Sequence, residues 1–366
     1  MSKQKITSAE AVSLLAFSLV ANIILTGGGK VAGQDVWISF LLVVCVMLPL
    51  AYIYRGIVLN CGDKGFFISV EETMGKPVGR LFNILIVLYS LFLGVIAFRS
   101  ISEFLFIAVL TRTPLYITRL LLGMLCIWAA KSGASFIARW SRLVFPIILT
   151  IVLMLVILSI PNFDLDNFKY TLFYGPQPVL QGAWNIFTYP MVEAALLLIP
   201  FCDLEKKKDT VKIYIVALVI TSLMGIIVNE RNILVMGEVL AKAYYFPSYK
   251  SAGIIRLTRF FDRIEIIRGM VYIVGSFLDG TFCLYVAAQG VNSMLGIKNE
   301  EAGVTAPMGI LMLTLAGSLF SQYSQLISYL QGPNGYIATA ILGVLPVIIW
   351  ITGKLRNGRK VKGNRG

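Results

Sequence analysis

Long apolar stretches separated by short polar ones dominate the pattern of this chain. A helix needs roughly 20 residues to cross the hydrocarbon core of a bilayer, and ten stretches approach that length. Their apolar runs are continuous rather than alternating, which indicates helices and not the strands of a barrel. The predicted spans are Ala11–Thr26, Val36–Tyr54, Leu81–Leu110, Leu115–Ala130, Leu143–Ile160, Val179–Phe201, Ile213–Val228, Ile264–Leu295, Val304–Phe320 and Tyr336–Thr352.

The boundaries of the later spans are set by turn residues and by length. No charged residue occurs from Ala302 to Gly353, and the turn signal Gly332–Gly335 divides this stretch into the last two helices. The third and eighth spans are longer than a bilayer requires, so we expect them to tilt or to protrude.

Two connections are more than turns. Asp63–Gly79 contains Val70–Thr73 and is predicted to form a short interfacial helix. Glu238–Arg263 mixes aromatic and charged residues, and two interpretations remain open for it. It is either a surface helix on the membrane or against a partner, or a partly ordered loop.

Composition strengthens the case for a membrane protein. Apolar residues make up 57% of the chain, charged residues 14%, and the mean hydropathy is +0.81, whereas soluble domains contain roughly 25% charged residues. A chain this poor in charge must use lipid as part of its solvent, and there only helices or closed barrels satisfy the backbone. The predicted fold class is therefore an all-α integral membrane protein of about ten transmembrane helices, forming one domain over residues 1–366.

The net charge of +13 first suggests a nucleic-acid partner. The basic residues, however, gather in alternate connections, as cytoplasmic Lys and Arg do in membrane proteins, so we expect no nucleic acid. With the N-terminus inside, the Glu205–Lys208 connection and the basic tail 354–366 are cytoplasmic, while Tyr245–Lys250 is outside. Both termini are then cytoplasmic, which requires an even number of spans.

Several classes of chemistry are absent from the sequence. The chain has no histidine, which excludes histidine-based triads, zinc sites and proton relays. Gly27-Gly28-Gly29-Lys30 is not a phosphate loop, because Ile24 and Val31 stand where glycine and Ser or Thr are needed. The five cysteines are scattered without a CxxC pair, and we interpret them as packing residues rather than a disulfide or zinc framework. We expect no enzyme, no metal and no cofactor.

Polar residues inside the spans are the functional candidates, because each costs free energy in lipid unless it is paired or faces water. Arg99 and Glu103 stand at i and i+4 and share a helix face. They are either an intrahelical ion pair that makes both tolerable or part of a coupling site. Asp279 lies near the middle of the eighth span without a basic residue within a turn. We consider it a cation or proton site, with a structural hydrogen-bonding role as the alternative.

A candidate ligand site comes from two irregular spans. Tyr189-Pro190-Met191 interrupts the sixth span just before Glu193, because proline removes a backbone donor. The first span carries Ala21, Asn22 and Ile23 near its middle, where we predict a second interruption. Open backbone at such breaks suits the carboxylate and ammonium of an amino acid. The predicted pocket is formed by Ala21–Ile23 and Tyr189–Glu193 near the bilayer midplane, with a simple kink and one satisfied acid as the alternative.

Interruptions in spans one and six place the breaks at equivalent positions of two sets of five spans. The first set covers about residues 8–160 and the second about 179–353. Five plus five spans with these breaks resemble the amino acid/polyamine/organocation permease (LeuT-like) fold, which by itself does not determine function.

Several short segments of the sequence also resemble those of one protein family. The chain resembles, along nearly its whole length, the spore germination permease family, the B subunit of spore germinant receptors. Each segment is weakly specific alone, and their order and spacing together are more so. The segments are Trp37–Ser39, Arg112–Leu115, Ser141–Leu143, Glu193 with Pro200 and Glu205–Lys208, Arg263–Glu265 and Ala287–Gly290.

The resemblance implies a permease-like sensor of small nutrients such as amino acids. It implies a complex with A and C subunits in the spore inner membrane, and a pocket lined by spans one, three, six and eight. One departure is that Val20-Ala21-Asn22 stands where the family usually has a glycine-containing break, so the break is either replaced by the Asn22 side chain or displaced toward Gly27. Two other functions remain open: a proton- or cation-coupled amino acid permease, and a scaffold subunit that binds nothing.

Overall fold

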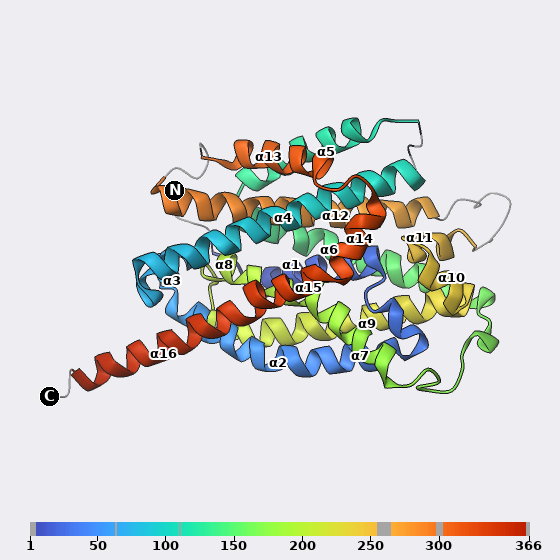
Figure 1. Cartoon of the computed structure of the whole chain (residues 1–366), viewed down its shortest axis with the longest axis horizontal. Coiled ribbons are helices and arrows are strands. Elements are labelled where there is room, and N and C mark those ends of the chain that lie inside the picture. Colours follow the sequence, from blue (N-terminus) through green and yellow to red (C-terminus); the bar gives the residue numbers. More distant parts are fainter. Residues whose placement is uncertain are drawn as a thin grey trace.

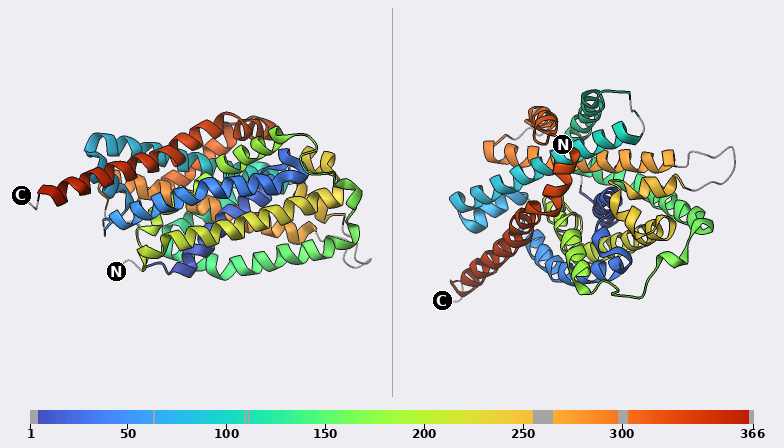
Figure 2. Two further views of the ribbon diagram at one scale, coloured as in Figure 1. Left: turned by 90° about the horizontal axis from the view of Figure 1, so that it is seen from below. Right: turned by 45° about the vertical axis from the view of Figure 1, so that its right-hand side comes forward.

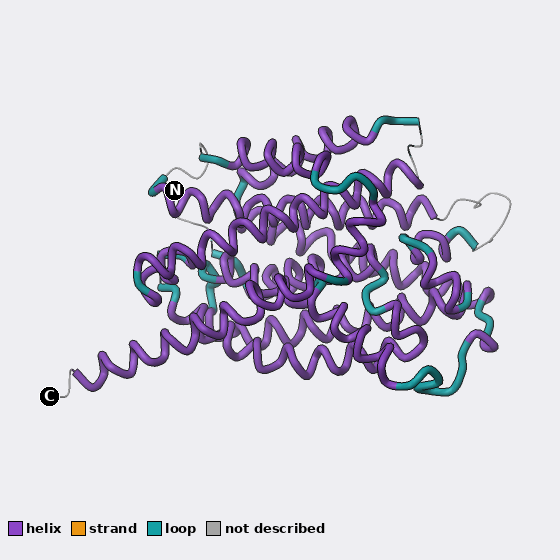
Figure 3. The backbone as a smooth tube through the Cα atoms, viewed as in Figure 1, coloured by secondary structure: helices purple, strands orange, loops and turns teal. Residues whose placement is uncertain are grey.

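The computed structural model describes residues 5–62, 64–108, 110, 112–254, 265–297 and 303–363. These residues are almost all helical and contain no β-strand (Figure 3). The helices are α1 (Ser8–Thr26), α2 (Val36–Asn60), α3 (Phe66–Met74), α4 (Lys76–Ala108), α5 (Leu115–Lys131), α6 (Ala134–Ser159), α7 (Pro176–Thr188), α8 (Leu198–Phe201), α9 (Thr210–Met236), α10 (Glu238–Ala243), α11 (Pro247–Ala252), α12 (Glu265–Leu295), α13 (Thr305–Ser318), α14 (Tyr323–Gln331), α15 (Pro333–Ala338) and α16 (Leu345–Gly363).

The long helices run side by side along the longest axis of the molecule (Figure 1). Seven helical segments of the described residues are long and apolar enough to cross a membrane, and α13 with α14 forms an eighth if the bent pair counts as one. Two shorter helices, α1 with 19 residues and α5 with 17, occupy the predicted first and fourth spans. The all-helical membrane fold predicted from the apolar pattern is confirmed.

The boundaries of α1 follow from its local sequence. Thr7 Oγ1 accepts a hydrogen bond from the Glu10 backbone N–H, and the Glu10 carboxylate accepts one from the Thr7 N–H, which forms a capping box. At the other end Gly27 takes a left-handed conformation with φ 62°, and its N–H donates to Ile23 O. Glycine adopts this conformation at little cost, so the helix stops here.

Close helix contacts hold the bundle together through small residues. A Cβ placed on Gly280 of α12 would lie 2.7 Å from Phe98 of α4, and one on Gly94 of α4 would lie 2.7 Å from Met312 of α13. The Ser90 hydroxyl of α4 also donates to Cys283 O of α12 at 2.9 Å. α4 and α12 therefore pack along each other, and α1 lies among α6, α9 and α12.

The two ends of the bundle differ. Both marked termini and α3 lie at one end, which we call the terminal end, and α10 and α11 lie at the other, which we call the α11 end (Figures 1 and 2). At the terminal end, the Ile6 backbone pairs with Asp203 and Glu205 after α8, and α16 projects beyond the bundle. The helix predicted around Val70–Thr73 is α3.

The last two predicted spans need a correction. The ninth, Val304–Phe320, is a helix of only 14 residues, α13, followed by α14, which is bent by 103° relative to it. The turn at Gly332–Gly335 separates α14 from α15 rather than the two spans directly. Gln322 is extended and polar residues follow it, so the chain changes direction before the predicted turn. The predicted segment Glu238–Arg263 forms α10 and α11, while its part from residue 255 to 263 lies outside the described residues.

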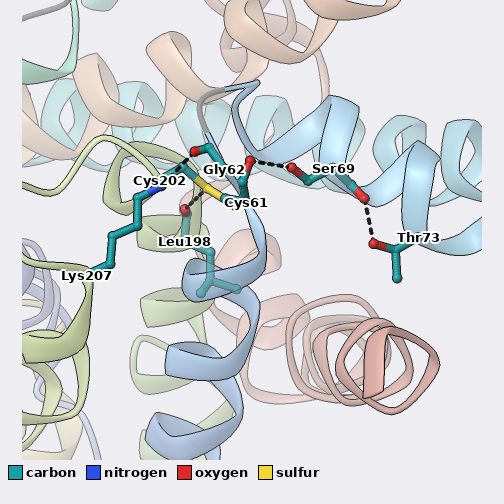
Figure 4. The surroundings of a disulfide bond; sticks show 7 residues. All are labelled: Cys61, Gly62, Ser69, Thr73, Leu198, Cys202 and Lys207. Atoms are coloured by element: carbon teal, nitrogen blue, oxygen red, sulfur yellow. Dashed lines mark hydrogen bonds between the residues drawn. A yellow bond between two sulfur atoms is a disulfide. The ribbon is translucent and has the colours of Figure 1, made fainter. Parts of the chain in front are cut away.

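The interpretation of all five cysteines as packing residues is also wrong. Cys61 at the end of α2 and Cys202 at the end of α8 are disulfide-bonded, with their Cα atoms 5.7 Å apart (Figure 4). Lys207 Nζ donates to Gly62 O beside the bridge at 2.6 Å. The two residues are 141 positions apart in sequence, so spacing alone carried no signal of their contact. Cys45, Cys126 and Cys283 are free.

The sidedness of the two ends is testable by labelling. We expect the α11 end to face outward and the terminal end to face the cytoplasm, because Lys and Arg concentrate at the terminal end. Ser248 in α11 is fully buried and is a poor probe, whereas Lys250 in α11 and Lys206 after α8 are exposed. In a cysteine-free background, an impermeant maleimide should label Lys250→Cys in intact cells and Lys206→Cys only after permeabilisation. The reverse pattern contradicts this orientation.

Candidate functional site

The sixth span is broken where the sequence predicted. α7 ends at Thr188, Tyr189 is extended with φ −156° and ψ 112°, and a 3-10 helix over Met191–Leu197 leads into α8. The N–H of Glu193 donates to Pro190 O, which turns the chain sharply. Tyr189 precedes this turn and Glu193 follows it, and both side chains are buried.

The first span is not broken at Ala21–Ile23. α1 is a continuous helix from Ser8 to Thr26 and ends only at Gly27. The prediction of an interruption at Asn22, and of open backbone there for a carboxylate, is therefore wrong. Asn22 is tolerated inside the helix because its side chain, rather than freed backbone, makes the polar contacts. The open backbone of this span lies at Gly27–Gly29 instead.

The Asn22 side chain is the centre of a buried polar cluster. Its Nδ2 donates to Glu193 Oε2 at 3.4 Å, and its Oδ1 accepts from the Tyr189 hydroxyl at 3.2 Å. The Asp279 carboxylate is hydrogen-bonded to Asn22 and to Ser18. Five polar side chains thus meet at one place. They come from α1, from α12 and from the break after α7. We call this the Asn22 cluster: Ser18, Asn22, Tyr189, Glu193 and Asp279.

Small residues allow the helices of the cluster to approach. A Cβ on Gly275 of α12 would lie 2.7 Å from Ala21 Cβ, so α1 and α12 are in close contact one turn from Asp279. Ile23 and Met191 are buried and supply apolar packing next to the polar groups. The cluster is therefore enclosed in hydrocarbon-like surroundings, where its hydrogen bonds are strong and an unpaired group is costly.

Glu193 retains one free acceptor. Its Oε1 is buried and has no hydrogen-bond partner, while Oε2 is bonded to Asn22. Two carboxylates, Glu193 and Asp279, lie close enough to interact electrostatically, and the cluster contains no cation. Chemically, such a group can accept a proton, a monovalent cation or the ammonium of a ligand.

Arg99 and Glu103 form a second buried group. Arg99 Nη2 lies 2.6 Å from Glu103 Oε1 within α4. The sequence did not indicate Arg119 of α5, whose guanidinium is buried and interacts electrostatically with both residues. Tyr323 is hydrogen-bonded to Ser100 and interacts electrostatically with Glu103 and with Tyr189. Tyr323 therefore lies between this group and the Asn22 cluster.

Aromatic rings pack against one another near the α11 end. Phe104 stacks on Tyr272 with ring centroids 4.6 Å apart, and Phe246 stacks on Tyr323 at 5.6 Å. A cavity of about 40 Å³ is lined by Gly27–Val31, Asn185, Tyr189 and Tyr245. This volume holds a few waters, so the cavity is too small for an amino acid as it stands.

A larger cavity opens at the terminal end. Its volume is about 360 Å³, and it lies between α3, the end of α8 and the last turns of α12. The size is in the range of small-molecule sites. Polar groups along its wall include Lys64, Asp203, Gln289 and Asn292. In the described part of the chain, the larger cavity therefore lies at the terminal end and the smaller one at the α11 end.

Sequence reasoning missed Ser18, Arg119 and Tyr323. Ser18 had a usable signal, because it stands four residues before Asn22 and so shares its helix face. Arg119 and Tyr323 lie near predicted span ends, where such residues are common, and only the packing of α5 and α14 against α4 brings them inside.

The sequence of this chain matches a known protein family. Residues 5–324 match the spore permease family, described as spore germination protein. Spore germination protein KB of Bacillus subtilis (strain 168) is 27% identical over 361 residues, covering 96% of this chain and 95% of that protein. Spore germination protein GerQB of Bacillus cereus is 23% identical, covering 96% of this chain and 94% of that protein.

Solved structures support the fold. Mhp1, a nucleobase-cation-symport-1 family transporter in a closed conformation with bromovinylhydantoin bound, superposes with a TM-score of 0.66, 12% identity and coverage of 93% of this chain and 78% of that chain. MhsT in complex with L-phenylalanine superposes with a TM-score of 0.61, 14% identity and coverage of 94% and 98%. The chain has the LeuT-like permease fold and belongs to the spore germination permease family.

Proposed function

We propose that this chain is the membrane-embedded, nutrient-sensing subunit of a spore germinant receptor. It binds a small germinant such as an amino acid and triggers germination with A and C subunits in the spore inner membrane. The ligand contacts lie on the Asn22 cluster, with Ala21, Ile23 and Met191 as apolar neighbours.

The observation that supports this proposal best is the free acceptor on Glu193. A buried carboxylate with one unpartnered oxygen, next to a second carboxylate and to the amide of Asn22, suits a positively charged ammonium group. Tyr189 donates to Asn22 and also lines the cavity of about 40 Å³, and a ligand from the α11 end would arrive through that cavity.

A coupled amino acid permease is the second candidate. Two adjacent carboxylates without a cation suit a proton or a monovalent cation as a co-transported ion, and the cavity at the terminal end would serve as an exit. MhsT, of the same fold, was solved with L-phenylalanine bound.

Ligand binding and transport are separated by one pair of measurements. In lipid nanodiscs, a germinant amino acid should raise the thermal unfolding midpoint of the wild-type protein saturably, and Glu193→Gln should remove most of that rise. In vesicles, the same labelled amino acid should not accumulate. Accumulation driven by a proton or sodium gradient favours the permease instead, and a midpoint independent of every amino acid contradicts both functions.

Asp279 provides a test of ion coupling. We expect Asp279→Asn to remove the dependence of the response on pH or on monovalent cations, because the variant cannot carry a charge. Its amide oxygen can still accept from Ser18 and Asn22, so protein abundance should stay near the wild-type level. The germination response is measured against pH and against potassium and sodium concentration. An unchanged pH and cation profile in the variant reduces Asp279 to a structural hydrogen-bond acceptor.

A further inference from the structure

Two arginines are buried near each other at the α11 end, away from the Asn22 cluster. Arg231 lies five residues before the end of α9, and Arg268 lies in the first turn of α12. Their exposed fractions are 2% and 1%, and Arg268 is one of the largest fully buried side chains of the described residues. The two guanidinium groups are close enough for their charges to repel.

Arg231 has a structural role that does not neutralise its charge. Its Nη2 donates to Asn232 Oδ1 at 2.8 Å, to Ser248 O at 3.1 Å and to Ser251 Oγ at 2.5 Å. These bonds fasten α11 to α9, but all three acceptors are neutral. The buried Nε of Arg231 donates no hydrogen bond.

Arg268 is less satisfied than Arg231. Its Nε and Nη2 are both buried and donate no hydrogen bond. It also stands at the N-terminal end of α12, where the helix dipole adds positive rather than negative potential. Arginine remains protonated at neutral pH, so the site cannot lose its charge by releasing a proton.

The contrast with the buried Arg99–Glu103 ion pair is direct. Arg99 is paired with Glu103 at 2.6 Å, whereas none of the ion pairs formed among the described residues includes Arg231 or Arg268. Buried charges in proteins are normally paired, because removing them from water without a counter-charge is strongly destabilising. Among the side chains that the structure describes, the pair therefore has no ion-pair partner.

We propose that Arg231 and Arg268 bind a small anion, either a halide such as chloride or the carboxylate of a small acid. Two guanidinium groups, with unused donors on both, supply the hydrogen bonds and the charge that such an anion needs. The neighbouring Tyr272 ring is itself buried and stacks on Phe104.

The anion would affect how α11 and its aromatic neighbours pack at the α11 end. Arg231 holds α11 through Ser248 and Ser251, and Phe246 at the start of α11 packs on Tyr272 and Tyr323. Neutralising the repulsion between Arg231 and Arg268 would keep α9, α11 and α12 together. The packing of α9, α11 and α12 should therefore be more stable with the anion than without it.

The test uses the purified full-length protein in lipid nanodiscs. Its thermal unfolding midpoint is measured as chloride, bromide or acetate replaces a bulky sulfonate at constant ionic strength. We expect a saturable rise on the order of 5 °C with the preferred anion. Arg268→Gln should abolish the rise, and Arg142→Gln, which removes an exposed positive charge in α6, should retain it. A rise with acetate alone identifies a carboxylate, and a rise with chloride and bromide identifies a halide.

Equal midpoints of the wild-type protein in all four anions overturn the proposal, and so does a rise that Arg268→Gln retains. The wild-type titration decides the question even if Arg268→Gln does not fold. Asp262→Asn and Glu265→Gln are measured in parallel, because their side chains lie outside the described residues. If one of these carboxylates neutralises the pair, the unfolding midpoint of the wild-type protein does not depend on the anion. Only the variant that lacks this carboxylate then becomes anion-dependent. That result also overturns the proposal.

Discussion

Asn22→Leu should abolish the germination response, and Glu193→Gln should weaken it about 10- to 100-fold. Hydrogen bonds to charged groups contribute roughly 1.5–3 kcal/mol, and each 1.4 kcal/mol corresponds to about a factor of ten in affinity. Glu193→Gln removes the charge opposite a ligand ammonium while keeping an amide that can still bond to Asn22. Asn22→Leu puts an apolar side chain at the centre of the cluster, so a polar ligand can no longer form hydrogen bonds there.

The measurement is a germinant dose–response in spores carrying each variant, with the receptor quantified by immunoblot. Asn22 bonds to three neighbours, so some loss of stability is expected with leucine. Ser39→Ala is the matched control, because it removes a buried 2.8 Å hydrogen bond to Val179 O outside the cluster. If both site variants reach the control's protein level and keep the wild-type half-maximal concentration, the ligand site lies elsewhere.

Glu103→Gln should be the most damaging change in the second buried group. It leaves Arg99 and Arg119 without the single carboxylate that both interact with. Removing one partner of a buried ion pair costs on the order of 3–5 kcal/mol, which is a large share of the stability of most proteins. We therefore expect little Glu103→Gln protein to accumulate in membranes.

The companion variants show whether Arg119 belongs to the group. Arg99→Gln leaves Glu103 with Arg119, so its protein level should fall less than that of Glu103→Gln. The double variant Arg99→Gln/Glu103→Gln leaves one cation and should be intermediate. Abundance is followed by immunoblot and stability by thermal unfolding in detergent. Equal levels in all three variants mean that the group is reached by water, contrary to its burial in the bundle.

The contact between Asn22, Glu193 and Asp279 could be anticipated only in part. Each residue stood out because it interrupts an apolar span, and Pro190 marked the break beside Glu193. The meeting of Asn22 with Glu193 spans 171 residues, and the pairing of α1 with α12 depends on Gly275 accepting Ala21. The break predicted in the first span at Ala21–Ile23 is wrong. A polar residue within an apolar span is the same sequence feature whether its side chain makes the polar contacts or the helix is interrupted there.

By itself, the sequence determined the helical membrane fold, the approximate spans and the set of polar residues that had to be placed inside. These properties are local, since the free energy of transferring a helix into lipid is a sum over neighbouring residues. Only the tertiary structure decided that α1 continues through Asn22, that α14 bends away from α13 and that Cys61 meets Cys202. It also decided that Arg119 joins Arg99 and Glu103, and that Arg231 and Arg268 lie together. Such contacts depend on which helices pack against each other, and that choice is made by shape and polar pairing across distant segments rather than by hydropathy along the chain.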